Sequence, residues 1–248
     1  MREFTDDLGN VVVLPSEVRR VVSIVPSLTE SIAATHEHLL VGATDWCTHP
    51  THLDVTRVRG TKNPDLDVIE TLAPDVVIAN AEENRVVDLD ALRASGFAVW
   101  TTSPTTLDES LDSLERMLSA ITGALPEWLR QARDVWSTPY AGKRRRAVVP
   151  IWRRPWMALG RDTFAGDLLS RIGVDNVFAE SGERYPRIDP DALPAYDLVV
   201  LPDEPYAFSP DDGPEAFTQP AKCVSGRHLT WYGPSLVEAR DLLTRQLA

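Results

Sequence analysis

Two segments far apart in the chain follow the same pattern. Residues 66–79 (LDVIETLAPDVVIA) and residues 188–201 (IDPDALPAYDLVVL) each place a run with helical apolar spacing before an Asp and a Val-rich run. A short Val-rich run predicts a buried strand, and strands that alternate with helices predict a parallel sheet. Because the pattern occurs twice, we expect two similar α/β lobes in one chain.

The rest of both halves continues this alternation. The predicted strands lie at residues 20–25, 76–79, 97–100, 147–152 and 197–201, and the predicted helices at 66–72, 89–95, 163–172 and 189–193. Gly96 follows the second of these helices and is expected to end it. Ser27 with Glu30, and Thr106 with Glu109, have the spacing of a capping box, which predicts a helix start at each pair.

The middle of the chain is predicted to be helical. Apolar residues recur at helical spacing over residues 106–122, and a second apolar stripe follows Pro126 up to about residue 138. We therefore expect an N-terminal α/β lobe over residues 1–104, connecting helices over 105–141, and a C-terminal α/β lobe over 142–248.

Charge and hydropathy exclude several classes of protein. The net charge of −12 argues against a phosphate-backbone partner, so we expect no nucleic-acid binding. No apolar run reaches the roughly 18–20 residues of a membrane span, and the N-terminus lacks the apolar core of a signal peptide. We expect a monomer that is not membrane-embedded. As written, the sequence predicts a cytoplasmic protein, or an extracytoplasmic one if an export segment has been removed.

Functional residues are expected in the loops that follow the strands, because ligands of open α/β sheets bind beyond the carboxyl ends of the strands. Four of the seven tryptophans lie in such loops: Trp46, Trp152, Trp156 and Trp231. A Trp in a polar loop beside Arg and His favours a ligand platform over core packing. The common nucleophile, phosphate-loop and dinucleotide motifs are missing from the sequence. We therefore assign no catalytic residue and expect a protein that is not an enzyme.

The five histidines suggest bare metal binding as a minor alternative. His36 and His38 are two residues apart in a predicted helix, so we expect their rings to face different ways and not to chelate together. His49 and His52 lie in a polar loop and are interpreted as surface residues. We assign no metal ligand.

The order of several short motifs resembles one known family. They are RVVSIVPSLTE at 20–30, VGATDWCTHP at 41–50, NPDLDVIETLAPDVVIA at 63–79, PIWRRPWMALGRDTF at 150–164, DNVF at 175–178, LPDEPY at 201–206 and GRHLTWYGP at 226–234. Across residues 10–240 the chain resembles the class III, helical-backbone substrate-binding proteins of ABC importers. Within that family it is similar to the cobalamin-binding proteins of vitamin B12 importers.

The resemblance implies two Rossmann-like lobes joined by a long backbone helix near residues 126–138, with a non-covalent ligand in the cleft between them. The implied ligand-binding residues are Pro26, Trp46, Asn80, Glu82, Trp152, Arg153, Tyr185, His228 and Trp231. The family also implies an ABC permease as partner, docked through an acidic residue on each lobe. Asp67 and Asp191 occupy these positions, although each is equally well explained as an acid at a helix N-terminus.

The charges around the implied cleft favour a corrinoid ligand. A corrinoid is a broad, partly apolar disc edged with amides, whereas a ferric siderophore is often anionic and would need several converging Arg. The sequence offers Arg153, Arg154 and Arg227 against Glu82, Glu83, Asp203 and Glu204. Cobalamin or a related corrinoid is therefore the expected ligand. An iron chelate, haem or a metal ion, or a role as a cytosolic ligand sensor or carrier, are the alternatives.

Overall fold

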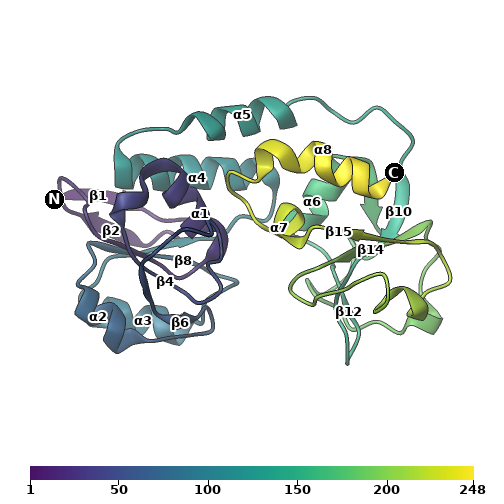
Figure 1. Cartoon of the computed structure of the whole chain (residues 1–248), viewed down its shortest axis with the longest axis horizontal. Coiled ribbons are helices and arrows are strands. Elements are labelled where there is room, and N and C mark those ends of the chain that lie inside the picture. The colour runs from purple at the N-terminus through teal and green to yellow at the C-terminus, as the bar shows by residue number, and fades with distance from the viewer. The chain divides into compact units, whose positions relative to one another are not determined.

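The computed structural model describes all 248 residues and divides into two compact units. Unit 1 comprises Met1–Pro104 and Ser110–Leu129, and unit 2 comprises Thr105–Glu109 and Arg130–Ala248. The chain passes between the units three times: after Pro104, within helix α4 (Leu107–Thr122) and within helix α5 (Glu127–Trp136) (Figure 1). The helical middle of the chain is thus confirmed. The expected division into 1–104, 105–141 and 142–248 stays a prediction.

Unit 1 is built on a parallel sheet of five strands in the order β5-β4-β3-β8-β9. The strands are β3 (Val21–Ser23), β4 (Leu40–Ala43), β5 (Thr56–Arg57), β8 (Val76–Asn80) and β9 (Val99–Thr102). Besides its parts of α4 and α5, this unit contains the helical segments α1 (Pro26–His36), the 3-10 turn η1 (Glu37–Leu39), α2 (Leu66–Leu72) and α3 (Val86–Ala94). Two small antiparallel pairs join β1 (Arg2–Thr5) to β2 (Val11–Leu14), and β6 (Arg59–Gly60) to β7 (Asn63–Pro64).

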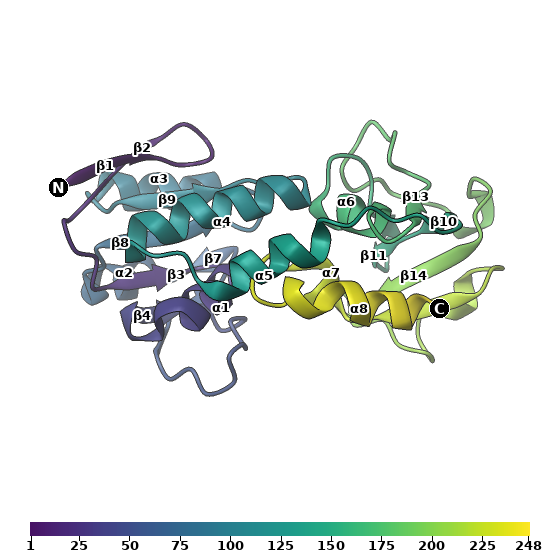
Figure 2. The ribbon, with the colours of Figure 1, turned by 90° about the horizontal axis from the view of Figure 1, so that it is seen from above.

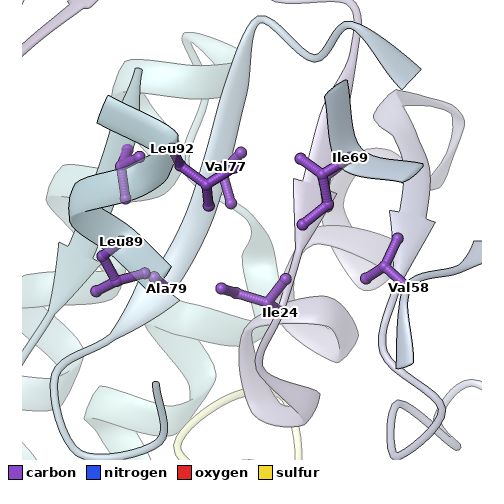
Figure 3. Packing of buried hydrophobic residues seen from close by; sticks show 9 residues of the cluster. Ile24, Val58, Ile69, Val77, Ala79, Leu89 and Leu92 are labelled. Carbon is purple, nitrogen blue, oxygen red and sulfur yellow. The ribbon is translucent and has the colours of Figure 1, made fainter. Parts of the chain in front are cut away.

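The core of unit 1 explains why its central strands are almost entirely apolar. Val77 and Ile78 are neighbours on β8 and point to opposite faces, yet both are fully buried. A strand buried on both faces reads as a continuous apolar run, as in parallel sheets covered by helices. In Figure 3, Leu89 and Leu92 of α3 lie beside Ala79 and Val77 in the same buried cluster. Each buried Val, Leu or Ile side chain of this cluster contributes about 1.5–3 kcal/mol through its removal from water.

Unit 2 is built on a parallel sheet of four strands in the order β13-β10-β14-β15. The strands are β10 (Arg145–Val148), β13 (Val174–Asn176), β14 (Leu198–Pro202) and β15 (Ala221–Val224). A small antiparallel pair consists of β11 (Pro150–Trp152) and β12 (Met157–Ala158). The helical segments are α6 (Phe164–Ser170), η2 (Pro190–Ala192), η3 (Pro214–Ala216), α7 (Gly226–Thr230) and α8 (Leu236–Leu247) (Figure 2).

The two sheets share one topology. When the edge strand β5 is set aside, the first strand of each sheet along the chain lies between the second and the third, and the last strand lies beyond the third. Thus β3 lies between β4 and β8, as β10 lies between β13 and β14, and unit 1 adds only the edge strand β5. The expectation of two similar α/β lobes, drawn from the repeated sequence pattern, is confirmed.

Helix α4 has the buried face and the capping box that its sequence predicts. Its Leu107, Leu114 and Leu118 are fully buried. The backbone N–H of Glu109 donates to Thr106 Oγ1 at 3.2 Å, and the N–H of Thr106 donates to a carboxylate oxygen of Glu109 at 3.2 Å. This reciprocal pair is the predicted capping box.

Two other local predictions are wrong. Helix α1 begins at Pro26 with Val25 as its N-cap and no side-chain cap, so Ser27 and Glu30 form no capping box and are instead buried. Pro supplies the helical φ without needing an N–H partner at this position. The predicted strand 147–152 is divided, because Pro150 lacks the N–H that a central strand donates. The chain leaves the parallel sheet after Val148 and continues as β11.

No helix combines the length and the apolar character needed to cross a bilayer.

Candidate ligand-binding site

Four of the predicted site residues belong to unit 1 and lie where neighbouring strands end. Pro26 follows β3, Trp46 follows β4, Asn80 is the last residue of β8, and Glu82 lies two residues beyond it. Because β4, β3 and β8 are adjacent and parallel, their following loops emerge at one edge of the sheet. The topology of unit 1 therefore brings these four positions to the same edge.

Trp46 is an exposed ring on an anchored loop. Its side chain is 67% exposed, whereas the next residue, Cys47, is fully buried. The Cys47 sulfur lies 3.1 Å from the hydroxyls of both Thr29 and Thr44, and the N–H of Asp45 donates to the carbonyl of Arg59 at 2.8 Å. Burial raises the pKa of the Cys47 thiol, so this group packs as a neutral side chain and is not an activated nucleophile.

Arg57 fastens the same loop from β5. Its guanidinium donates to the backbone carbonyls of Thr44 and Cys47 at 2.9 and 3.0 Å, and to that of Leu53 at 3.1 Å. Arg57 thus binds three backbone carbonyls of one loop. Two of them, those of Thr44 and Cys47, flank Trp46 and hold its part of the loop in place. The sequence carries no local signal for Arg57, because its partners are set by the course of the loop.

Asn80 holds the loop after β8. It is only 5% exposed, and its amide donates to the carbonyl of Thr102 at 3.1 Å. Its side-chain oxygen accepts from the N–H groups of Glu82 and Glu83 at 2.8 and 3.0 Å. Asn84, which sequence reasoning missed, accepts from the N–H of Asn80 at 2.9 Å. Asn80 therefore positions the half-buried Glu82 through the backbone of this loop.

In unit 2, Trp152 is the exposed end of a row of aromatic rings. The row runs from Trp152 through Tyr206, Phe208 and Trp156 to Phe217. Successive ring centroids are 5.8, 4.6, 5.9 and 5.3 Å apart, which are favourable distances for aromatic pairs. Trp152 is 44% exposed, while Phe208 is buried. We call these five residues the aromatic row; they give Trp152 a rigid support.

Arg153 is tied to the aromatic row and to two carboxylates. Its guanidinium lies 5.2 Å from the centre of the Trp156 ring, forms an ion pair with Asp212, and approaches Glu215 at 2.5 Å. Asp212 also accepts a hydrogen bond from the Tyr206 hydroxyl at 2.6 Å. The positive charge of Arg153 is thus matched within unit 2. Asp212 and Glu215 were not predicted from the sequence, because they lie about 60 residues beyond Arg153.

His228 and Trp231 use their polar atoms inside unit 2, at helix α7. Both side chains belong to residues that are only 8% exposed. The Nδ1 atom of His228 is 2.8 Å from the Ser225 hydroxyl, and its Nε2 is 2.9 Å from a carboxylate oxygen of Glu238. The indole N–H of Trp231 donates to Glu204 at 3.1 Å. Both residues therefore stabilise the segment around α7 through contacts within unit 2 that need no ligand.

The contact with His228 should make stability depend on pH through Glu238. The hydrogen bond from His228 is the main cause that lowers the pKa of Glu238 from its ordinary value of 4.5. Because the pKa of Glu238 is lower in the folded state, ionised Glu238 stabilises the fold at pH values above 4.5. This stabilisation is lost as the pH falls below 4.5 and through the lowered pKa. We expect Glu238→Gln to lower the free energy of unfolding near pH 7, with a difference from wild type that shrinks below about pH 4.

Urea denaturation of both proteins at several pH values measures this difference. Asp241→Gln, on the same helix and exposed, removes the same charge without touching His228 and serves as the control. A Glu238→Gln difference that stays constant from about pH 7 to about pH 3.5 would contradict the assigned contact.

The remaining predicted residues are surface positions or half-buried. Tyr185 is half-buried, with the Arg184 guanidinium 5.9 Å from its ring centre. Asp67 is exposed in the first turn of α2, whose N-cap is Asp65, and Asp191 is exposed in η2. Both acids thus occupy the starts of helical segments and are accessible to a partner.

One expectation about the histidines is wrong. Helix α1 ends at His36, and His38 lies in the following turn η1, so the two are not on one helix. Their rings meet edge to face with centroids 5.6 Å apart. His52 is 70% exposed and lies 2.8 Å from a carboxylate oxygen of Glu37. The structure contains no group of three or more His, Cys, Asp or Glu side chains arranged to hold a metal ion.

The sequence of this chain is similar to those of known binding proteins. No family model matches the sequence. A vitamin B12-binding protein of Vibrio cholerae is 28% identical over 184 residues, which are 70% of this chain and 66%, just under two thirds, of the relative. The expected similarity to cobalamin-binding proteins is therefore confirmed.

Solved structures agree with the predicted fold. The periplasmic vitamin B12-binding protein BtuF of Vibrio cholerae superposes with a TM-score of 0.75 at 21% identity, covering 94% of this chain and 98% of that one. The periplasmic haem-binding protein RhuT of Roseiflexus gives a TM-score of 0.72 at 19% identity, covering 92% and 97%. The chain has the α/β fold of the class III periplasmic binding proteins, as predicted.

Proposed function

We propose that the protein is the substrate-binding component of an ABC importer and that it binds cobalamin or a related corrinoid without a covalent bond. The observation that carries this proposal is the exposed face of Trp152 at the end of the aromatic row. A broad, partly apolar disc needs a flat, rigid apolar surface, and a Trp ring held by other rings supplies one at little cost in entropy. The similarity to vitamin B12-binding proteins supports the corrinoid.

The site residues divide into two kinds in this proposal. Trp46 and Trp152 are exposed on held loops and are the residues we expect to contact the disc. Asn80, His228 and Trp231 are the positioning residues, because their polar atoms fasten the loops that carry the rest of the site. Pro26, Glu82, Arg153 and Tyr185 complete the proposed set.

Delivery of the ligand to a permease is the second part of the proposal. Asp67 and Asp191 are exposed at the starts of α2 and η2, where a cationic partner surface can reach them. We infer that one acid on each lobe docks to the permease. The relatives in the comparison are periplasmic, which supports an extracytoplasmic location. We assign no catalytic residue, and the relatives are named as binding proteins.

Native mass spectrometry of the protein purified from its own source tests the ligand directly. We expect an added mass equal to that of a corrinoid, which disappears when the protein is unfolded. An added mass equal to that of haem or of a ferric siderophore would contradict the corrinoid assignment and support that alternative ligand. Genes for an ABC permease beside the gene for this chain support import, and their absence would favour a ligand sensor or carrier.

A further inference from the structure

Arg153 forms ion pairs with two carboxylates that are not among the proposed ligand-binding residues. Arg153 is the cation nearest to Trp152 in the sequence, and its side chain is 18% exposed. It faces two carboxylates, Asp212 and Glu215, and stacks over Trp156. Two carboxylates against one guanidinium give this group of three side chains a net negative formal charge.

The carboxylates are held in place by other contacts. Asp212 accepts from the hydroxyl of Tyr206, which is the ring that supports Trp152. Glu215 accepts from the N–H of Gly213 at 2.6 Å, and this hydrogen bond is the main cause that lowers the pKa of Glu215. The hydrogen bond from Gly213 favours the anionic form of Glu215, and both carboxylates are fixed beside the ligand platform by hydrogen bonds that do not depend on Arg153.

Arg227 shows the same pattern at helix α7. Its guanidinium lies 3.8 Å from a carboxylate oxygen of Glu238, which also contacts His228. Two of the three arginines that could attract an anion are thus already facing carboxylates. An anionic ligand would have to displace these carboxylates or approach them, and either costs free energy in a partly desolvated site.

We propose that Asp212 and Glu215 determine the charge selectivity of the site: by neutralising Arg153 they make unit 2 accept an electroneutral disc and reject a polyanionic one. The identity of the preferred disc rests on the function proposed above, whereas the exclusion of anions rests only on the contacts of Arg153. An arginine released from both carboxylates would offer a fork of donors that matches a ligand carboxylate.

The test is the double variant Asp212→Asn, Glu215→Gln. Asn can still accept from the Tyr206 hydroxyl and Gln from the Gly213 N–H, so the neighbouring contacts are kept while both charges are removed. The probe is the dicyano complex of ferric protoporphyrin, a disc with two carboxylates whose axial positions are already filled. We expect the variant to bind this probe at least about tenfold more tightly than wild type does.

Two controls separate this effect from the loss of overall charge. The variant Asp211→Asn, Asp241→Asn removes the same charge at exposed positions, and we expect no gain in its affinity for the probe. Adding Arg153→Gln to the double variant should abolish the gain, and raising the salt concentration should reduce it. The single variant Glu215→Gln keeps the Asp212 contact and should show a smaller gain in affinity for the probe. It tests the proposal if the double variant does not fold well.

The outcomes distinguish this inference from the proposed function. Equal affinity of the double variant and its charge-matched control for the porphyrin would overturn the selectivity role of Asp212 and Glu215. A gain that survives Arg153→Gln would also overturn it. Failure of every form to bind cyanocobalamin would count against the corrinoid and would leave the porphyrin comparison valid.

Discussion

Replacing Trp152 with Ala is expected to weaken the binding of cyanocobalamin at least about tenfold, equivalent to about 1.4 kcal/mol. The ring is 44% exposed and is supported by Tyr206 with centroids 5.8 Å apart, so it presents a fixed apolar face. Its removal takes away the contact area of one large side chain, and the remaining aromatic row ends at Tyr206. Isothermal titration calorimetry measures the change without relying on the tryptophan signal.

Trp128 provides the matched control. It is a half-buried tryptophan on α5 whose indole N–H donates to Thr35 of α1 at 3.3 Å, and it is not one of the predicted site residues. Trp128→Ala should leave the affinity within about twofold of wild type. If Trp152→Ala and Trp128→Ala bind cyanocobalamin equally well, Trp152 is not the platform.

Replacing Trp100 with Ala is expected to lower the free energy of unfolding by about 3–5 kcal/mol. Trp100 lies on β9, is only 1% exposed, and contacts Phe4 with ring centroids 6.1 Å apart. The truncation would leave a large cavity beside the sheet of unit 1. Urea denaturation followed by circular dichroism measures the loss.

Trp100→Phe is the informative comparison, because the indole Nε1 of Trp100 is buried and has no hydrogen-bond partner. Phe keeps most of the apolar volume and removes this unsatisfied donor, whose burial already costs the native state about 1–3 kcal/mol. We expect Phe to cost less than about 2 kcal/mol. Equal losses for Ala and Phe would mean that the cavity is not the main penalty.

The parts of the fold that depend on local pattern could be predicted from the sequence. The Val-rich runs at 76–79 and 197–201 are central strands in their sheets, and the periodic leucines of 106–122 form the buried face of α4. The Val-rich runs and the periodic leucines both reflect burial, and the apolar character of each buried residue can be read directly from the sequence. The repeated order of these elements was enough to predict two similar sheets.

Features that depend on distant partners could not be predicted in the same way. Arg153 reads in sequence as a cation available to a ligand, but the fold brings Asp212 and Glu215 to it from the segment after β14. The resemblance implies that His228 binds the ligand, yet Ser225 and Glu238 contact its two ring nitrogens. His36 and His38 were expected to face apart because the end of α1 between them was not recognised.

Calorimetric titration with cyanocobalamin, with tryptophan fluorescence followed in parallel, tests the central claim most directly. The corrin absorbs in the near ultraviolet and visible, so a ligand seated beside Trp46 and Trp152 should quench their emission. We predict a single saturable phase with measurable heat and a dissociation constant of about 1 μM or lower. The absence of heat, together with no quenching beyond the inner-filter effect, would contradict the assignment of a corrinoid ligand.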